Sequence, residues 1–222
     1  MRAGTKYTVP VVLMITMFEV TAGFAQIKPK TAGLGLRGSY WNMHSHTPTI
    51  NVINGSEYSL VDLGGAGGWL YFFSRTSDSW FIELHLGGIA DVIERHEYFE
   101  GADTRILTVV PVLLGLRHPL VSPQNGAALR PYIAGGGGPY WIADVFVHER
   151  YYHDQEVAIA SKLHPGAYAG GGFDFMLSSN FGLNLEVKHH FVNFNVNDEH
   201  SGYELGLGLQ FYWGDYKPAR RD

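Results

Sequence analysis

The side chains that could carry chemistry in this sequence are titratable groups that recur at every second position of several segments. The positions between them carry no Asp, Glu, Lys or Arg. The titratable set holds six acids, five bases and two histidines: Arg37, Asp62, Glu83, His85, Asp91, Arg105, Arg117, Arg130, Asp174, Glu186, Lys188, His190 and Glu204. Because acids and bases nearly balance, they predict a buried network of paired, hydrogen-bonded charges. A path that conducts ions is the alternative.

The segments that must position these groups alternate with period two between an apolar phase and a polar, glycine-rich phase, which is the pattern of β-strands. They cover residues 33–43, 61–73, 80–92, 105–117, 130–145, 164–177, 181–192 and 203–213. The last segment is the clearest, because Leu205, Leu207 and Leu209 alternate with Glu204, Gly206 and Gly208. The sequence therefore predicts an all-β chain of about eight strands, each with one apolar face.

The direction of the apolar face decides the class of protein. A soluble barrel would bury this face around a small ligand, whereas a membrane barrel turns it toward lipid and has strands of about 9–11 residues or more. Long segments, an uncharged apolar phase and glycines on the polar phase favour the membrane, because a narrow interior needs small residues beside large ones. We predict an eight-stranded antiparallel up-and-down transmembrane β-barrel. A soluble ligand-binding β-barrel remains the alternative.

The first part of the chain has the order of a secretory signal peptide. Arg2 and Lys6 precede an apolar run over residues 9–18, and small residues end at Ala25. We expect residues 1–25 to be a cleaved signal peptide and residues 26–222 to form the barrel domain. The sequence has no cysteine, so disulfides and thiolate sites are excluded. Its net charge of -5 excludes a nucleic-acid-binding surface.

The connections and aromatic residues give the barrel an orientation. Outer loops are predicted near residues 47–58, 93–103, 146–161 and 194–201, and shorter inner turns near 74–79, 118–128 and 178–180. Aromatic side chains at the lipid interface are expected in an inner belt of Tyr71, Phe73, Trp80, Phe175, Phe181, Phe211 and Trp213. An outer belt is expected from Tyr40, Trp141, Phe191 and Tyr203.

Three stretches carry a resemblance to a known family. They are Val110-Pro-Val-Leu-Leu-Gly-Leu-Arg117, the run from Arg130 to Tyr140, and Leu205-Gly-Leu-Gly-Leu-Gln-Phe-Tyr-Trp213. From about Leu34 to Trp213 the chain resembles the small eight-stranded outer-membrane barrels of Gram-negative bacteria, which include the OmpA-like and OmpW-like barrels. Members of that family usually end on the aromatic residue of the last strand, whereas here Gly214 to Asp222 follow it.

The resemblance implies a monomer in the cell outer membrane that contacts membrane lipid. It also implies that the secretion and barrel-assembly machineries act on the chain during biogenesis. The family's roles are envelope integrity, surface contact or passage of small apolar compounds, without catalysis. We therefore expect a non-enzymatic protein without a cofactor or a bound nucleic acid.

Two kinds of chemical site are weighed against that expectation. In outer-membrane lipid A deacylases a His is followed two residues later by a Ser and further on by a Glu. His190 and Glu204 resemble that order, but Val192 occupies the serine position and has no oxygen to attack an ester. A metal site in the outer loops is the other possibility, and we expect these histidines to be solvated instead: His44, His46, His96, His148, His153 and His200.

Overall fold

The computed structural model describes residues 28–43, 60–62, 65–97, 101–122, 126–149 and 155–216. Within these ranges the chain forms nine strands: β1 (Lys30–Met43), β2 (Leu60–Asp62), β3 (Gly65–Arg75), β4 (Phe81–Glu97), β5 (Gly101–Pro119), β6 (Leu129–Glu149), β7 (Gln155–Met176), β8 (Phe181–Val192) and β9 (Gly202–Asp215). The predicted signal peptide, residues 1–25, lies outside the described residues. In the described part of the chain, no helix is long and apolar enough to span a membrane.

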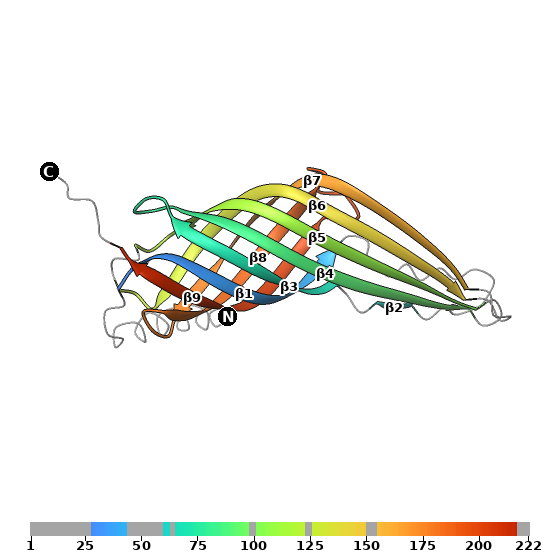
Figure 1. Ribbon diagram of the computed structural model, residues 1–222, viewed down its shortest axis with the longest axis horizontal. Helices are drawn as coiled ribbons and strands as arrows, with labels where there is room; N and C mark the ends of the chain where they lie inside the picture. The colour runs from blue at the N-terminus through green and yellow to red at the C-terminus, as the bar shows by residue number, and fades with distance from the viewer. Residues whose placement is uncertain are drawn as a thin grey trace, which may run out of the picture.

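Eight of these strands close into a ring (Figure 1). Each pairs antiparallel with its neighbours in the order β4-β3-β1-β9-β8-β7-β6-β5, and β5 returns to β4. The ring closes near the chain ends, where β1 pairs with β9 from Lys30 opposite Asp215 to Met43 opposite Gly202. β2 is an addition, pairing only with β4 at Leu60 opposite Arg95. The predicted eight-stranded antiparallel up-and-down barrel is confirmed.

The period of two in the sequence becomes an inside and an outside. Along β9 buried and exposed residues alternate from Gly202 to Trp213. Leu207 is 64% exposed on the outer face, whereas Gln210 is completely buried inside. The outer wall is thus aliphatic, while buried charged and polar side chains such as Glu204 and Gln210 point inward, the arrangement of a barrel whose outside faces lipid. A soluble barrel with an apolar interior is the wrong interpretation.

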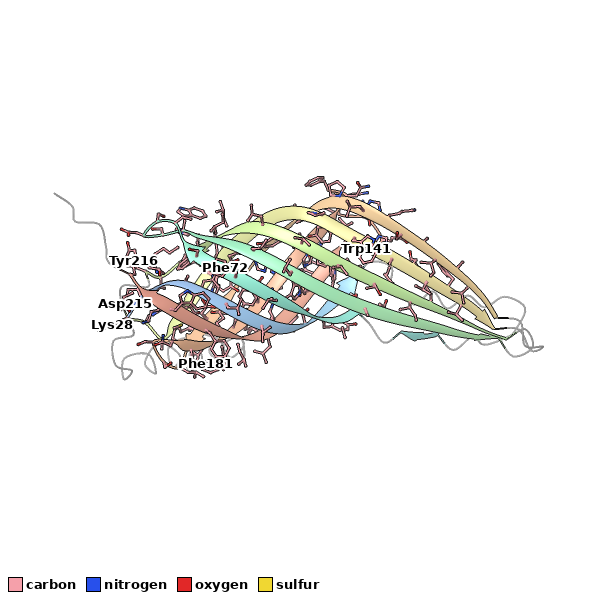
Figure 2. The ribbon with its side chains drawn as sticks, in the orientation of Figure 1. Lys28, Phe72, Trp141, Phe181, Asp215 and Tyr216 are labelled. Atoms are coloured by element: carbon pink, nitrogen blue, oxygen red, sulfur yellow. The ribbon has the colours of Figure 1, made fainter. Side chains whose placement is uncertain are left out.

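Most of the predicted interface aromatics lie on this outer wall. Figure 2 labels Phe72 and Phe181 in the half of the barrel that holds Lys28 and Tyr216, and Trp141 farther along it. We call the half that holds Lys28 and Tyr216 the inner end, and the opposite one the outer end. The predicted aromatics that do point outward are Tyr40, Trp80, Trp141, Phe175, Phe181, Phe191, Tyr203, Phe211 and Trp213, of which Phe175, Phe181 and Phe191 are half-buried.

The prediction for Tyr71 and Phe73 is wrong, because these two side chains lie on the inner face of β3. They are 1% and 2% exposed and point into the barrel. Their neighbours Leu70 and Phe72 are the outward residues. The error arises because both phases of β3 are apolar or aromatic, so hydrophobic alternation cannot distinguish its two faces.

Two predicted outer loops are also largely strand. β4 continues to Glu97 and β5 begins at Gly101, while β6 continues to Glu149 and β7 begins at Gln155. Charged or polar residues stand at adjacent positions in parts of these ends, as in Glu94-Arg95-His96-Glu97, so the regular apolar period that marks a strand breaks down, but hairpin pairing still satisfies their backbone groups. Figure 1 shows β4 to β7 running beyond the ends of β1, β3, β8 and β9. We call this projecting part the extension.

Two prolines within strands occupy gaps in the pairing. The β4–β5 pairing stops at Leu86 opposite Val112 and resumes at Ile89 opposite Val109, on either side of Pro111. A similar gap in the β5–β6 pairing lies beside Pro139, which faces Pro165 across β6 and β7. Since proline has no N–H to donate, these are the places where a sheet tolerates it.

The lipid-facing wall can be tested with a matched pair of exposed leucines. Leu114 lies on the outer face of β5 and Leu120 in the turn after it, and each is 57% exposed. Leu114→Arg should lower the free energy of unfolding in a bilayer by about 2 kcal/mol, because it puts a charge into hydrocarbon. Leu120→Arg should change it little. Urea titration, followed by the gel shift between unheated and heated samples, measures both effects. Equal effects of the two substitutions would contradict the placement of Leu114 within the membrane.

Candidate functional site

The predicted titratable set converges in the barrel interior, the lumen. Eleven of its side chains are buried there: Arg37, Glu83, His85, Asp91, Arg117, Arg130, Asp174, Glu186, Lys188, His190 and Glu204. Arg105 lies at the outer end, with its side chain 27% exposed, and its Nε donates to Asp144 over 2.9 Å. The side chain of Asp62 lies outside the described residues.

Arg117 organises the inner end of the network. Its guanidinium donates to Glu83 at 3.2 Å and to Asp174. The same group lies 3.5 Å from the centre of the Tyr132 ring, a cation–π contact. Asn184 donates to Asp174 at 2.9 Å. Together these bonds link β5, β4, β7 and β8 through Arg117, Glu83, Asp174 and Asn184. One arginine therefore compensates two buried carboxylates.

Arg37 and Lys188 share a carboxylate in the middle of the barrel. Arg37 donates to Glu186, and the Lys188 Nζ lies 2.8 Å from the other oxygen of Glu186. The Lys188 ammonium also lies 4.8 Å from the ring centre of Trp69 and 4.9 Å from that of Tyr168. Aromatic faces thus supply part of the solvation that these cations lose on burial.

His190 stands at the outer side of this layer between a phenol and a carboxylate. Its Nδ1 is 2.9 Å from the Tyr140 hydroxyl and its Nε2 is 2.7 Å from Glu204. The indole N–H of Trp69 also donates to Glu204. The Trp41 ring stacks on His190 with 4.1 Å between ring centres. His190 and Glu204 are therefore brought together as a fully packed pair.

This pair does not form the deacylase site that the sequence order suggested. His190 is completely buried in the lumen, so it cannot reach an acyl chain in lipid. Val192 is also completely buried, and its backbone N–H donates to the Ser201 hydroxyl over 2.9 Å. That hydroxyl donates in turn to the Asn195 carbonyl over 2.7 Å. The nearby serine is thus held in the loop backbone and not presented as a nucleophile.

Sequence reasoning missed most of the aromatic side chains that fill the lumen. They are Trp41, Trp69, Tyr71, Phe73, Tyr132, Tyr140, Tyr168 and Tyr212, all 9% exposed or less. A signal was available, since Trp41 shares a phase with Arg37, and Tyr212 with Glu204. Glycines make room for these rings: a Cβ added at Gly35 would overlap the Tyr71 ring. The interior is therefore filled by rings and charges together.

The outer mouth of the lumen holds a small polar cavity of about 140 Å³. β6, β7 and the loop after β8 line it, with Asp144, Lys162, His164 and His200 among the lining residues. His200 is buried and contacts Asp198 at 3.0 Å, so the expectation that this histidine is solvated is wrong; its ring also lies near that of His164. Within the described ranges, no three His, Asp or Glu side chains are grouped so as to hold a metal ion.

The other loop histidines of the metal hypothesis cannot be placed. His44, His46 and His153 lie outside the described residues, and the side chains of His96 and His148 do as well. The expectation that these histidines are solvated therefore stays a prediction.

Arg117→Leu tests whether the buried charge network contributes strongly to the stability of the barrel. It leaves Glu83 and Asp174 buried without their shared cation, so the free energy of unfolding should fall by about 3–5 kcal/mol. The control is Lys30→Ala, which breaks the exposed 2.8 Å pair with Asp215 and should lower it by about 1 kcal/mol or less. Urea titration of the two variants in the same detergent makes the comparison. Similar small losses would show that the buried pairs contribute little.

No protein-family model matches the sequence, and a search of curated proteins finds no match. Solved structures do share its fold. The outer membrane protein OprG from Pseudomonas aeruginosa is 13% identical with a TM-score of 0.54, over 86% of this chain and 100% of that one. Ail of Yersinia pestis is 12% identical with a TM-score of 0.45, over 83% and 97%. The N-terminal β-barrel domain of Pseudomonas aeruginosa OprF is 14% identical with a TM-score of 0.44, over 84% and 99%.

The similarity to OprG extends over that whole chain, and it confirms the fold expected from the sequence. The outer wall adds an independent physical constraint, because its exposed aliphatic side chains require lipid around them. The protein therefore has the fold of the small eight-stranded outer-membrane barrels and resides in an outer membrane.

Proposed function

We propose that the protein is a sealed, non-enzymatic barrel that serves envelope integrity or contacts at the cell surface, and not a pore. The observation that carries the proposal is the filled lumen. Arg117, Arg37 and His190 mark three successive levels, and at each level charged groups bond across the interior to other strands. A hydrated ion passing through would have to displace these bonded groups at every level.

The energetics of burial favour a permanent seal over a gate. Separating Arg37 from Glu186 would leave two buried charges in a low-dielectric interior, at a cost of several kcal/mol for each ion. The aromatic rings around the cations prevent water from hydrating the separated charges, since Trp69 and Tyr71 are 3% and 1% exposed. The network thus favours one packed state under ordinary conditions.

The same burial supports a role without catalysis. A catalytic base must reach a substrate proton within about 3 Å. Tyr140 and Glu204 occupy both nitrogens of His190, and the ring is fully enclosed. His85 likewise contacts Glu83 at 3.1 Å and is fully buried. In this proposal the histidines are structural partners of carboxylates.

The partners we propose are those of a resident membrane protein. The aliphatic wall contacts lipid, and the outward aromatics Phe211 and Trp213 on the last strand suit recognition during barrel assembly. The barrel closes on itself through β1 and β9 and needs no second chain to complete its sheet. We therefore propose that it works as a monomer.

Planar-bilayer recordings test the seal. The wild-type barrel should show no steady, large single-channel conductance. Replacing Arg117 and Asp174 together by glycine removes one level of the network, and this double variant should show small conductance steps because water can enter. The matched control replaces Lys30 and Asp215, an ion pair at the inner rim. Large steady conductance of the wild type would overturn the proposal.

Passage of small apolar compounds is a second candidate, favoured by one feature of the outer wall. Beside the gap at Pro139 lies an apolar hollow of about 400 Å³, lined in part by Leu163, Pro165 and Phe194. Such a hollow could accept an apolar molecule from the cell surface and release it sideways into lipid. The buried Tyr140 closes the inner side of the same region.

Uptake of an apolar dye by outer-membrane vesicles with a lipopolysaccharide outer leaflet tests this second candidate. Phe194→Asp should slow uptake several-fold, because it places a charge at the hollow. Val196→Asp changes an exposed residue of the same loop outside the hollow and should leave the rate unchanged. Equal rates in wild type, both variants and protein-free vesicles would exclude passage.

A further inference from the structure

The inner end of the lumen holds more positive than negative charge. Three guanidinium groups lie there, at the end of β3, the end of β5 and the start of β6. Arg117 and Arg130 are buried, and Arg75 is half-buried. In the described chain, Glu83 and Asp174 are the buried carboxylates at this level. A surplus of one positive charge in a low-dielectric interior is costly unless something compensates it.

The two carboxylates are already engaged through all of their oxygens. One oxygen of Glu83 accepts from Arg117 at 3.2 Å, and the other contacts His85 at 3.1 Å. One oxygen of Asp174 accepts from Arg117, and the other accepts from Asn184 at 2.9 Å. Arg117 therefore takes up most of the negative charge at this level, and little remains for the other two guanidinium groups.

Arg130 is held in part by a neutral group. Its Nε donates to the Ala127 carbonyl over 2.9 Å, and its neighbour across the strand pair is the shared carboxylate Asp174. The positive charge of Arg117 repels Arg130, and Arg130 in turn repels Arg75. A carbonyl dipole satisfies a donor but does not neutralise a full charge, so the repulsion among the three guanidinium groups persists.

Arg75 extends this positive charge to the entrance of the lumen. Its Nη1 donates to the backbone carbonyl of Asp78 over 3.1 Å, and the Asp78 carboxylate attracts it from the exposed turn. The Arg75 guanidinium lies 4.7 Å from the centre of the Phe81 ring and 4.3 Å from that of Tyr216. Figure 2 labels Tyr216 at the inner end of the barrel. Arg75 therefore adds positive potential where the lumen meets the periplasmic side.

Arg117 and Arg130 both line a small hollow of about 20 Å³, which we call the inner hollow. Asp174 also lines it, and most of the remaining wall is aromatic, with Phe73 and Phe81 among the lining residues. Phe81 is the first residue of β4 after an inner turn, so the hollow lies at the inner end of the lumen. A space of this size has room for one particle slightly larger than a water molecule.

We propose that the inner hollow binds one monovalent anion of halide size. Such an anion compensates the surplus positive charge and accepts charge-assisted hydrogen bonds from Arg117 and Arg130. Water would fill the same space but leave the charge uncompensated, and a cation would add to the repulsion. Sulfate and phosphate are too large for the hollow. The site goes beyond the sealed-barrel function, because it concerns what completes the charge network at one end and not whether the lumen conducts.

Bromide locates the site directly, because it resembles chloride and scatters anomalously. The full-length chain is refolded and crystallised in non-ionic detergent with sodium gluconate, and the crystals are soaked in sodium bromide. An anomalous peak should lie in the inner hollow, within hydrogen-bonding distance of Arg117 and Arg130. Arg130→Gln should remove this peak. The matched control is Lys30→Gln, which removes a cation that pairs with Asp215 at 2.8 Å outside the hollow and should keep the peak. Absence of a peak in the wild type would overturn the proposal.

Urea titration in the same detergent tests binding in solution. The midpoint should rise when chloride replaces gluconate at constant ionic strength, because a ligand of the folded state stabilises it. Arg130→Gln should weaken the apparent chloride affinity about tenfold or more, and Arg75→Gln less, while Lys30→Gln should leave it unchanged.

The gel shift between unheated and heated samples shows whether each variant is folded. An equal effect of sulfate, or of chloride on the wild type and Arg130→Gln, would indicate general screening and overturn the proposal. The outcome does not depend on the sealed lumen, so a conducting barrel would leave it unchanged.

Discussion

The structure depends on one constraint: inside a bilayer, every backbone N–H and C=O must find its partner within the chain. A sheet meets this requirement only when its first and last strands pair, as β1 and β9 do from Lys30 to Met43. Once the ring has closed, each strand has one face toward lipid and one toward a narrow interior. The aliphatic wall, the crowded lumen and the placement of prolines at pairing gaps all follow from that closure.

The interior then raises a second difficulty, because polar groups on the inward phase are removed from water. The structure meets it by sharing partners, as when Arg117 bonds both Glu83 and Asp174, and by surrounding cations with aromatic rings. Such packing gives each charge several fixed contacts, so the lumen behaves as a core. Beyond the membrane the constraint relaxes, since water can satisfy a free strand edge. The part of β7 before Gly166, which β8 does not pair with, lies in this region.

The periodicity of the sequence was sufficient for the fold class and for most of the interior. Uncharged positions alternating with charged ones identify the lipid face wherever only one phase is apolar, as in β9. The method failed for Tyr71 and Phe73, because in β3 both phases are aromatic or aliphatic. It also failed at the outer hairpins around residues 93–103 and 146–161. Strands exposed to water on both faces need no apolar phase, so nothing local marks them.

The sequence by itself determined which titratable side chains share the interior, because along strands with one apolar phase a period of two assigns each charged residue to the other face. Only the tertiary structure decided which of these side chains contact one another. The order His190, Val192, Glu204 suggested a catalytic relation, but strand register instead placed His190 and Glu204 between Tyr140 and Trp69. Register and closure join residues far apart in the chain, such as Arg37 and Glu186. These pairings depend on how all eight strands are staggered around the ring, which no single segment encodes.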